Sequence, residues 1–380
     1  MVRALDGNDD GRSGASTADA GGILSIDLAA IVANWRDLKS RIEGAECAAV
    51  IKADAYGCGI EPVTAALSDA GCRTFFVAHL DEARRVRANA PHARIYVLNG
   101  LPPGSSHAYA DADLRPVLGS LAEIEEWQSF RGTRGWQGGA ALHVDTGMNR
   151  LGLRLDEAAR LKQSTVSAAG FDLLMSHFAC SDEPGHALNA RQMAKFREAR
   201  SLFPNLPGSL ANSSGIFLDP DAHHDLVRPG IALFGGNPTP GHSNPMQPVV
   251  TLEGRIIQVR NVEAGETVGY GGAWTARRPT RLAIVSIGYA DGLIRAASAT
   301  DIKPGAEAIV SGRYCPLAGR VSMDLLAIDV TDLPSGSVHR GDHATFLSKD
   351  ITIDDLAVHA GTIGYEILTS LGRRYHRIYR

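Results

Sequence analysis

Lys52 stands where a short apolar strand is predicted to meet a glycine-rich turn. Residues 48–51 before it suit a buried strand, and Gly57 and Gly59 after it suit a tight exit into a helix. Burial at a strand end favours the neutral form of a lysine, and a neutral amine can form a Schiff base. Tyr56 follows closely enough for its hydroxyl to reach a phosphate. The pattern predicts a pyridoxal phosphate (PLP) site, although by itself it also fits an ordinary surface lysine.

Further polar side chains follow the ends of other predicted strands. They are Arg150 in the segment Asp145–Arg150, His177, Asn212, Ser213, and Arg228, which Gly230 and Ile231 follow. Singly, Arg150 could pair with the aspartate of its own segment, and His177 could be a core histidine. Asn212 and Ser213 could cap a helix, and Arg228 could be a solvated loop residue. Their shared position at strand ends favours one common site, because barrel enzymes draw catalytic groups from that rim.

The elements that must position these residues alternate between strand and helix from residue 23 to residue 241. Strands are predicted at 23–27, 50–52, 74–78, 94–98, 114–118, 140–144, 171–175 and 208–211. Helices are predicted at 28–42, 61–70, 80–89, 120–130, 156–163 and 188–202. About eight such units favour an α/β fold with an N-terminal (β/α)8 TIM-type barrel over a doubly wound sheet. No GxGxxG fingerprint supports a dinucleotide fold.

The rhythm changes in the C-terminal part, residues 242–380. Strand-like segments, separated by turns rich in glycine and proline, occupy 249–262, 281–287, 306–310, 324–330 and 343–347. Only 352–360 and the last residues have a helical or mixed pattern, so a mainly β domain is expected, with the boundary in the glycine- and proline-rich segment 235–241. Residues 1–22, rich in Gly, Asp, Ser and Ala, are predicted to be a disordered leader.

Composition limits the class of protein. The chain of 380 residues is 44% hydrophobic and 21% charged, with a net charge of -4, which gives no reason to expect nucleic acid or an anionic membrane as a partner. Five scattered cysteines without a CxxC motif argue against a disulfide framework or a zinc site and suit a reducing compartment. Neither a signal peptide nor a membrane span is recognisable, so a cytoplasmic location is expected.

Nine segments, in one order and in both predicted domains, resemble the alanine racemases. They are Ala49–Gly57, Asp145–Gly152, Ser176–Ala179, Ala211–Ser213, Val227–Ile231, Gly269–Gly271, Ile287–Gly292, Gly319–Asp324 and Gly364–Glu366. The resemblance runs from about residue 23 to the C-terminus. It implies a PLP enzyme with a barrel and a C-terminal β domain, which interconverts L-alanine and D-alanine as a homodimer with shared sites. Such an enzyme supplies D-alanine for peptidoglycan or serves alanine breakdown.

The resemblance also implies roles for individual residues. Lys52 should hold PLP covalently and act as one acid/base, and Tyr270 should be the other, reaching into the partner subunit's site. The implied cofactor-binding residues are Lys52, Tyr56, His177, Asn212, Ser213, Arg228, Gly230, Ile231 and Tyr365. The implied substrate-binding residues are Arg150 and the backbone of Met323, with Tyr289 and Asp324 at the entrance.

Physical chemistry is consistent with these roles. Racemisation removes a proton from one face of Cα and returns one on the other, which two bases on opposite faces can do without moving the substrate. Lysine and tyrosine side chains ordinarily titrate near pH ~10, so a base of either type needs a lowered pKa. Arg228 should face the pyridine nitrogen, and because arginine keeps its proton, the ring is then a weaker electron sink. Arg150 can grip a carboxylate through two parallel hydrogen bonds.

Two positions depart from the family pattern. Many members carry a lysine, often carbamylated, where this chain has His143. A neutral histidine cannot replace the charge of a carbamate, so another group, an ordered anion or a water network must orient Arg150. Ser322 stands where cysteine is common. These departures affect how the substrate carboxylate is expected to be held, but not which reaction is expected.

The sequence leaves three alternatives to an alanine racemase. A broad-specificity amino-acid racemase would keep the fold, but Tyr289 and Tyr365 favour a narrow site suited to alanine. A decarboxylase with the same domain plan is disfavoured by Tyr270 and those two tyrosines. A non-catalytic PLP carrier would resemble the barrel alone and would need no second base, so the C-terminal domain that carries Tyr270 discriminates against it.

Overall fold

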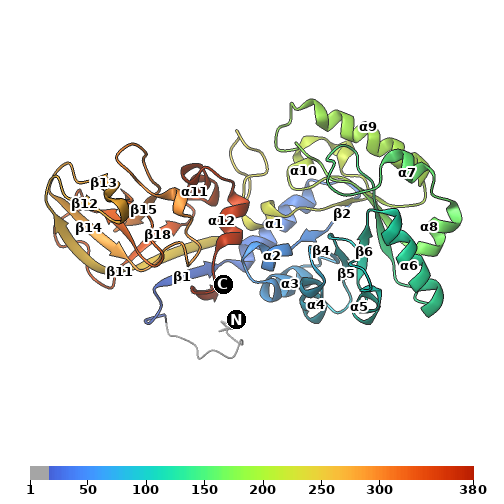
Figure 1. The fold of residues 1–380 in the computed structure, drawn as a ribbon, viewed down its shortest axis with the longest axis horizontal. Coiled ribbons are helices and arrows are strands. Elements are labelled where there is room, and N and C mark those ends of the chain that lie inside the picture. Colours follow the sequence, from blue (N-terminus) through green and yellow to red (C-terminus); the bar gives the residue numbers. More distant parts are fainter. Residues whose placement is uncertain (1–16) are drawn as a thin grey trace. The chain divides into compact units, whose positions relative to one another are not determined.

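The computed structural model describes residues 17–380, and these residues form two compact units (Figure 1). The first, here called the barrel unit, comprises Ile31–Leu233 and Asn237–Met246. The second, here called the β unit, comprises the described residues up to Ala30, Phe234–Gly236 and Gln247–Arg380. Each unit has its own sheet and its own buried core.

The barrel unit is built on parallel strands. In spatial order they are β3 (Ala49–Val50), β4 (Thr74–Val77), β5 (Arg94–Val97), β6 (Arg115–Leu118), β7 (Ala140–His143), β8 (Phe171–Met175) and β9 (Gly208–Ser209). The remaining strand, β10 (Leu226–Val227), pairs in parallel with β2 (Glu46–Cys47), which leads directly into β3.

Backbone hydrogen bonds close these strands into a barrel. The N–H of Arg228 donates to the carbonyl of Ala211, which joins the last two strands. The N–H of Ala48 donates to the carbonyl of Val227, and that of Val50 donates to the carbonyl of Pro229. The eight-stranded barrel expected from the alternation of strands and helices is therefore confirmed.

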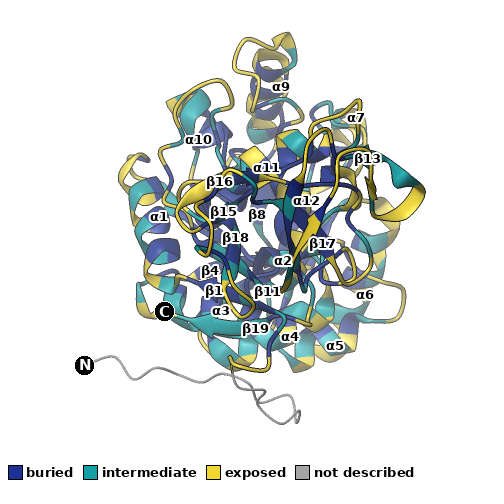
Figure 2. Ribbon diagram, turned by 90° about the vertical axis from the view of Figure 1, so that its left-hand side faces the viewer, coloured by how far each residue is buried: buried dark blue, intermediate teal, exposed yellow. Residues whose placement is uncertain are grey.

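Helices follow the strands, and most of them carry buried residues on one side and intermediate or exposed residues on the other (Figure 2). They are α1 (Leu28–Ser40), α2 (Lys52–Tyr56), α3 (Ile60–Asp69), α4 (Leu80–Asn89), α5 (Ser106–Asp111), α6 (Leu121–Arg134), α7 (Leu155–Ala159), α8 (Gln163–Ala169), α9 (Ala187–Leu202) and α10 (Gly215–Leu218). The helix expected at 156–163 ends earlier, because Lys162 has an extended backbone (φ -71°, ψ 149°) and α8 begins after it.

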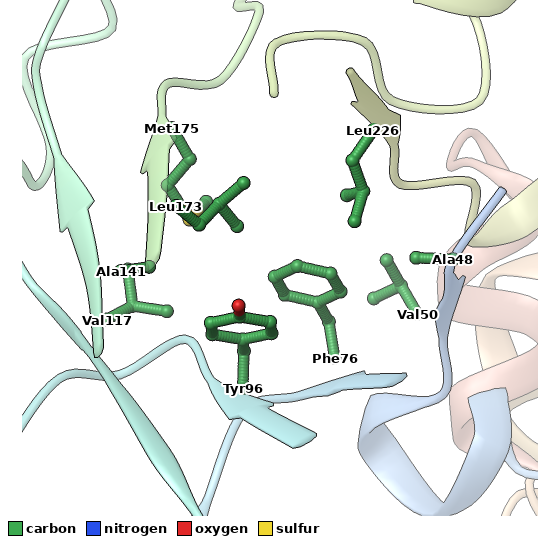
Figure 3. Packing of buried hydrophobic residues seen from close by; sticks show 9 residues of the cluster. All are labelled: Ala48, Val50, Phe76, Tyr96, Val117, Ala141, Leu173, Met175 and Leu226. Atoms are coloured by element: carbon green, nitrogen blue, oxygen red, sulfur yellow. The ribbon is translucent and has the colours of Figure 1, made fainter. Parts of the chain in front are cut away.

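Side chains from the strands fill the barrel interior (Figure 3). The cluster consists of Ala48, Val50, Phe76, Tyr96, Val117, Ala141, Leu173, Met175 and Leu226. The rings of Phe76 and Tyr96 stack with centroids 4.9 Å apart. This layer is packed rather than hollow, as is usual for such barrels, so only the loops beyond the strand ends are free to build a site.

The β unit is organised around the long strand β11 (Val250–Val262). The other strands are β1 (Gly22–Ile26), β12 (Thr267–Val268), β13 (Trp274–Thr275), β14 (Thr280–Val285), β15 (Glu307–Val310), β16 (Arg313–Pro316), β17 (Leu326–Asp329), β18 (His343–Leu347) and β19 (His376–Tyr379). Two helices, α11 (Ile353–Ala360) and α12 (Gly364–Ser370), and the 3₁₀ turns η3 (Tyr270–Gly272) and η4 (Arg295–Ala297) complete it. The mainly β domain is confirmed.

The N-terminal residues depart from the expectation in the sheet that their strand joins. The strand expected at 23–27 forms, but as β1 it pairs antiparallel with β11 and parallel with β19, so it belongs to the β unit and not to the barrel. Residues 17–22, assigned to a disordered leader, are held by Arg255, which donates side-chain hydrogen bonds to the carbonyls of Thr17 and Ala20. The rest of that leader, residues 1–16, lies outside the described residues.

No helix between residues 17 and 380 combines the length and the apolar character needed to cross a bilayer.

Candidate active site at the C-terminal rim of the barrel

Lys52 follows β3 directly and begins α2, whose backbone is unusual. Ala53, Asp54, Ala55 and Tyr56 all have φ between 53° and 55°, so they form a left-handed helical turn without a glycine. Each L-residue in this conformation costs about 1–2 kcal/mol, and such strain persists only where neighbouring contacts enforce it. The turn places Lys52 and Tyr56 at its two ends.

The Lys52 amine is partly buried, and its pKa is lowered. Burial is the largest cause because it penalises the charged form, and the positive charge of Arg150 adds to it. The carboxylate of Glu82 acts in the opposite direction. A larger fraction of neutral amine is therefore present near neutral pH than for an exposed lysine, as Schiff-base formation requires.

Arg228 is a buried cation with neutral partners. Its guanidinium donates to the carbonyl of Ser176 at 2.5 Å, to the hydroxyl of Ser209, and to Nδ1 of His177 at 3.4 Å. No carboxylate within residues 17–380 pairs with it. Burial lowers the Arg228 pKa to about 9, which leaves the group protonated at neutral pH, in line with the general resistance of arginine to deprotonation.

Two histidines beside this arginine are held neutral. Burial is the main cause that lowers the pKa of His177 well below its ordinary value, with Arg228 and Arg150 as further causes. The pKa of His143 is lowered to about 4, again mainly by burial and then by Arg228. Lys52 and the two arginines therefore make this part of the rim electropositive, and the neutral histidines add no charge to it. The rim is suited to an anionic ligand.

A second cluster on the same rim presents hydroxyl and backbone N–H groups. The hydroxyl oxygen of Ser213 accepts hydrogen bonds from the N–H groups of Gly230 (2.9 Å) and Ala232 (3.3 Å), so its own proton remains available to donate. Gly230 packs directly against the hydroxyl of Tyr56, closer than any side chain would allow. Ile231 begins the 3₁₀ turn η2 (Ile231–Phe234), and the first N–H of such a turn has no partner within it.

Asn212 has the structural role that its sequence context also allowed. Its side-chain oxygen accepts from the N–H of Gly215 at 2.9 Å, at the start of α10, and from the hydroxyl of Ser181 at 2.8 Å. The side chain thus shapes the loop that carries Ser213. A contact of Asn212 with the cofactor stays a prediction.

The loop that carries Arg150 is organised by Asp145. One oxygen of this carboxylate accepts from the N–H groups of Gly147, Met148 and Asn149, at 2.9 to 3.1 Å. Asp145 therefore does not form the ion pair with Arg150 that the sequence alone allowed. Arg150 is exposed and makes no hydrogen bond or ion pair to another described residue. Its guanidinium is free to receive a carboxylate.

A buried glutamine that the sequence did not single out joins two of these loops. Gln192 on α9 donates to the hydroxyl of Thr146 at 3.1 Å and to the carbonyl of His177 at 2.8 Å, and it accepts from the N–H of Ala179 at 2.9 Å. The loops after β7 and β8 are thereby held together. A polar residue on a helix gives no sequence signal for such a role, because helices usually expose polar residues to solvent.

The remaining predicted site residues belong to the β unit. They are Tyr270, Tyr289, Met323, Asp324 and Tyr365. The N–H of Ala290 donates to the carbonyl of Met323 at 3.0 Å, which brings the segments around Tyr289 and Met323 together. Arg374 pairs with Asp324 at 2.8 Å. Tyr270, in η3, is 72% exposed, and Met323 is 53% exposed.

The donor set of the barrel rim fits PLP. A lysine with a lowered pKa suits an aldehyde, and a buried guanidinium without a carboxylate partner suits a ring nitrogen that accepts a hydrogen bond. The cluster around Ser213 and Gly230 offers the Ser213 hydroxyl and the N–H of Ile231, which are usual partners of a phosphate. The fold and this site define a PLP-dependent enzyme that combines a (β/α)8 barrel with a β domain.

Comparison with known proteins identifies the family. Residues 26–238 match "Alanine racemase, N-terminal domain", and residues 249–379 match "Alanine racemase, C-terminal domain". An alanine racemase of Methylobacterium sp. (strain 4-46) is 55% identical over 365 residues, which cover 96% of this chain and 99% of the relative. A crystal structure of alanine racemase from Bartonella henselae, with covalently bound pyridoxal phosphate, is 39% identical, with a TM-score of 0.90 over 95% of this chain and 100% of that one.

The chain belongs to the alanine racemase family. The expectations of a PLP-dependent racemase, of alanine as the amino acid and of PLP as the cofactor are confirmed with it.

Proposed function

We propose that Lys52 and Tyr270 are the two bases of an alanine racemisation in which the other rim residues hold cofactor and substrate. The observation that carries this proposal is the partly buried Lys52 amine, whose pKa is lowered, at a strand end beside Arg150. PLP, when bound, withdraws electrons from the Cα of an attached amino acid and so makes its proton removable. Every other requirement falls on the side chains of this protein.

Cofactor binding is assigned to both clusters of the rim. Tyr56, Ser213 and the N–H of Ile231 hold the phosphate, with Gly230 allowing the close approach of Tyr56. Tyr365 of the β unit is the further phosphate ligand in this proposal. Arg228 donates a hydrogen bond to the ring nitrogen and keeps its proton, while His177, neutral and hydrogen bonded to Arg228, fixes the guanidinium plane.

Substrate binding is assigned to Arg150 and to the backbone N–H of Met323. The exposed guanidinium of Arg150 makes two parallel hydrogen bonds with the alanine carboxylate. Tyr289 and Asp324 line the entrance, and two bulky aromatic side chains, Tyr289 and Tyr365, favour alanine over larger amino acids. The carboxyl group is thus fixed while Lys52 takes or gives the proton on one face of Cα.

The second base comes from a partner subunit in this proposal. The Tyr270 side chain is 72% exposed, whereas a catalytic base acts on its substrate in a site from which water is excluded. Another protein surface must therefore cover Tyr270 during the reaction. Tyr289, Met323 and Tyr365, each more than 40% exposed, add apolar surface to the same unit. A homodimer that buries these side chains and delivers Tyr270 to the neighbouring barrel satisfies both needs.

The reaction can serve either the supply of D-alanine or the breakdown of alanine. L-alanine and D-alanine have equal free energies, so the enzyme yields an equal mixture, and the enantiomer that other reactions consume sets the net flow. We also infer a cytoplasmic location. All five cysteines lie in the described residues and are free thiols, which suits a reducing compartment.

The proposal is tested by incubating the purified protein with L-alanine and resolving the enantiomers by chiral chromatography, with a panel of larger amino acids in parallel. Formation of D-alanine, with little conversion of the panel, is expected. Conversion of many amino acids at similar rates would support a broad-specificity racemase instead. PLP binding without conversion of any amino acid would indicate a cofactor carrier.

A further inference from the structure

The left-handed turn that begins at Lys52 is anchored by a side chain from the next βα unit. Glu82, in the first turn of α4, accepts a hydrogen bond from the N–H of Ala53 at 2.6 Å. The same carboxylate accepts from the N–H groups of Ala78 (2.9 Å) and His79 (3.1 Å), at the end of β4. One carboxylate therefore joins the residue after Lys52 to the end of the neighbouring strand.

The turn needs such an anchor because nothing in its sequence favours it. Ala53 to Tyr56 contain no glycine, yet all four residues have positive φ. A second contact works from the other side: the Asp54 carboxylate accepts from the N–H of Ile60 at 3.1 Å and from Arg85 at 2.7 Å. Of these anchors, Glu82 binds nearest to Lys52 in the chain.

We propose that Glu82 is a positioning residue for racemisation, which holds the left-handed turn so that the Lys52 amine and the Tyr56 hydroxyl are aligned before the cofactor binds. This inference rests on the proposed role of Lys52 as base and as covalent holder of PLP. Glu82 touches neither the cofactor nor the substrate in this account. It acts through the backbone of Ala53 and through its negative charge, which opposes the effects of burial and of Arg150 on Lys52.

The chain offers a matched control in Glu123 on α6. This carboxylate accepts from the N–H of Leu101 at 3.0 Å, and from the N–H of Gly119 (3.0 Å) and the hydroxyl of Ser120 (2.9 Å). It therefore joins the loops after two neighbouring strands in the same way as Glu82. No left-handed run of residues and no catalytic lysine lies in the loops that it joins. Substitutions at the two positions remove equivalent bonds in different places.

The test compares Glu82→Gln with Glu123→Gln in the full-length apoprotein, so that the readouts do not depend on activity. Hydrogen exchange followed by mass spectrometry reports the N–H groups of segment 52–57, and the pH dependence of Lys52 acylation, followed by peptide mapping, reports its pKa. Glu82→Gln is expected to speed exchange in that segment about tenfold or more, because a charge-assisted bond is lost. It should also shift the labelling curve to lower pH, since the opposing negative charge is gone.

Glu123→Gln should leave both readouts unchanged while destabilising the fold by a similar amount. In the PLP-loaded enzyme, Glu82→Gln should lower kcat more than it changes KM for alanine. In the apoprotein, Glu82→Asp keeps the negative charge on a shorter side chain. It should therefore restore the labelling curve but only part of the exchange protection. If Glu82→Gln does not fold, the exchange rate of segment 52–57 in Glu82→Asp decides the question, and faster exchange than in the wild type is expected.

The proposal is overturned if Glu82→Gln leaves both exchange in segment 52–57 and the labelling curve at wild-type values, if Glu82→Asp leaves exchange at its wild-type rate, or if Glu123→Gln alters both readouts as much as Glu82→Gln does. These outcomes are independent of the proposed function. If Lys52→Ala retained racemisation, the proposed role of Lys52 would be rejected. The exchange result would still show whether Glu82 holds the turn.

Discussion

Gly230→Ala is the most informative single change because its effect can be worked out from the packing. A Cβ at this position would lie closer than 3.0 Å to the Tyr56 hydroxyl oxygen and 3.0 Å from its ring carbon Cζ. Real side chains do not approach so closely, so Tyr56 or the strained turn beneath it must move. The backbone of Gly230 itself is not left-handed, and the effect is therefore steric and not conformational.

The expected magnitude follows from the usual cost of overpacking. We expect Gly230→Ala to lower the free energy of unfolding by about 1–3 kcal/mol. Displacement of the Tyr56 hydroxyl should also weaken PLP binding by about 10–150-fold, because a hydrogen bond to a charged group contributes about 1.5–3 kcal/mol. Urea unfolding of the apoprotein measures the first quantity, and titration with PLP, followed by the absorbance of the bound cofactor, measures the second.

A double-mutant cycle makes the prediction specific. Tyr56→Phe removes the closest atom, so adding Gly230→Ala in that background should cost clearly less than in the wild type, and the two changes should not be additive. Gly185→Ala, at a glycine with no atom within 4 Å of a new Cβ, serves as the matched control and should be nearly neutral. Additive effects of Gly230→Ala and Tyr56→Phe, or wild-type PLP affinity of Gly230→Ala, would refute the arrangement of this phosphate site.

The remaining predictions concern the two bases and a buried histidine. Lys52→Ala should abolish both the yellow absorbance of the holoenzyme and racemisation; a variant that kept both would exclude Lys52 as the covalent residue. Tyr270→Phe should keep the cofactor and lose most racemisation, and mixing it with Lys52→Ala should restore part of the activity through hybrid dimers, whereas no recovery despite proven subunit exchange would count against shared sites. His143 is neutral when folded and has a pKa of about 4, so its contribution to stability is complete above its unfolded pKa of ~6.5 and is lost as the pH falls toward about 4. The free energy of unfolding should therefore fall less steeply from pH 7 to pH 5 in His143→Gln than in the wild type; parallel curves would show that His143 titrates normally.

The sequence predicts the barrel and the positions on its rim well, because both depend on local pattern. Alternation of apolar runs and helical periodicity marks each strand end, and the parallel strands of a barrel bring those ends to one rim. Lys52, Arg150, His177, Ser213 and Arg228 could therefore be picked out before their contacts were known. The pairing of β1 could not, because a short strand buried on both faces does not encode which sheet it joins.

The contacts that hold the site could not be predicted either, because they leave no local pattern in the sequence. The left-handed turn after Lys52 consists of alanine, aspartate, alanine and tyrosine, none of which indicates positive φ in the way that glycine does. Glu82 and Gln192 lie on helices, where polar residues are usually solvated. Two of their partners, the N–H of Ala53 for Glu82 and the carbonyl of His177 for Gln192, lie in loops that are distant in sequence, so only the folded chain brings them together.

The central claim, proton transfer by one base on each face of Cα, is tested most directly by racemising L-alanine in heavy water and following Cα in the first turnovers. Two bases predict that newly formed D-alanine carries deuterium from solvent while unreacted L-alanine keeps its hydrogen. D-alanine that retains the original Cα hydrogen would mean that a single base had carried the proton across, and it would contradict the pairing of Lys52 with Tyr270.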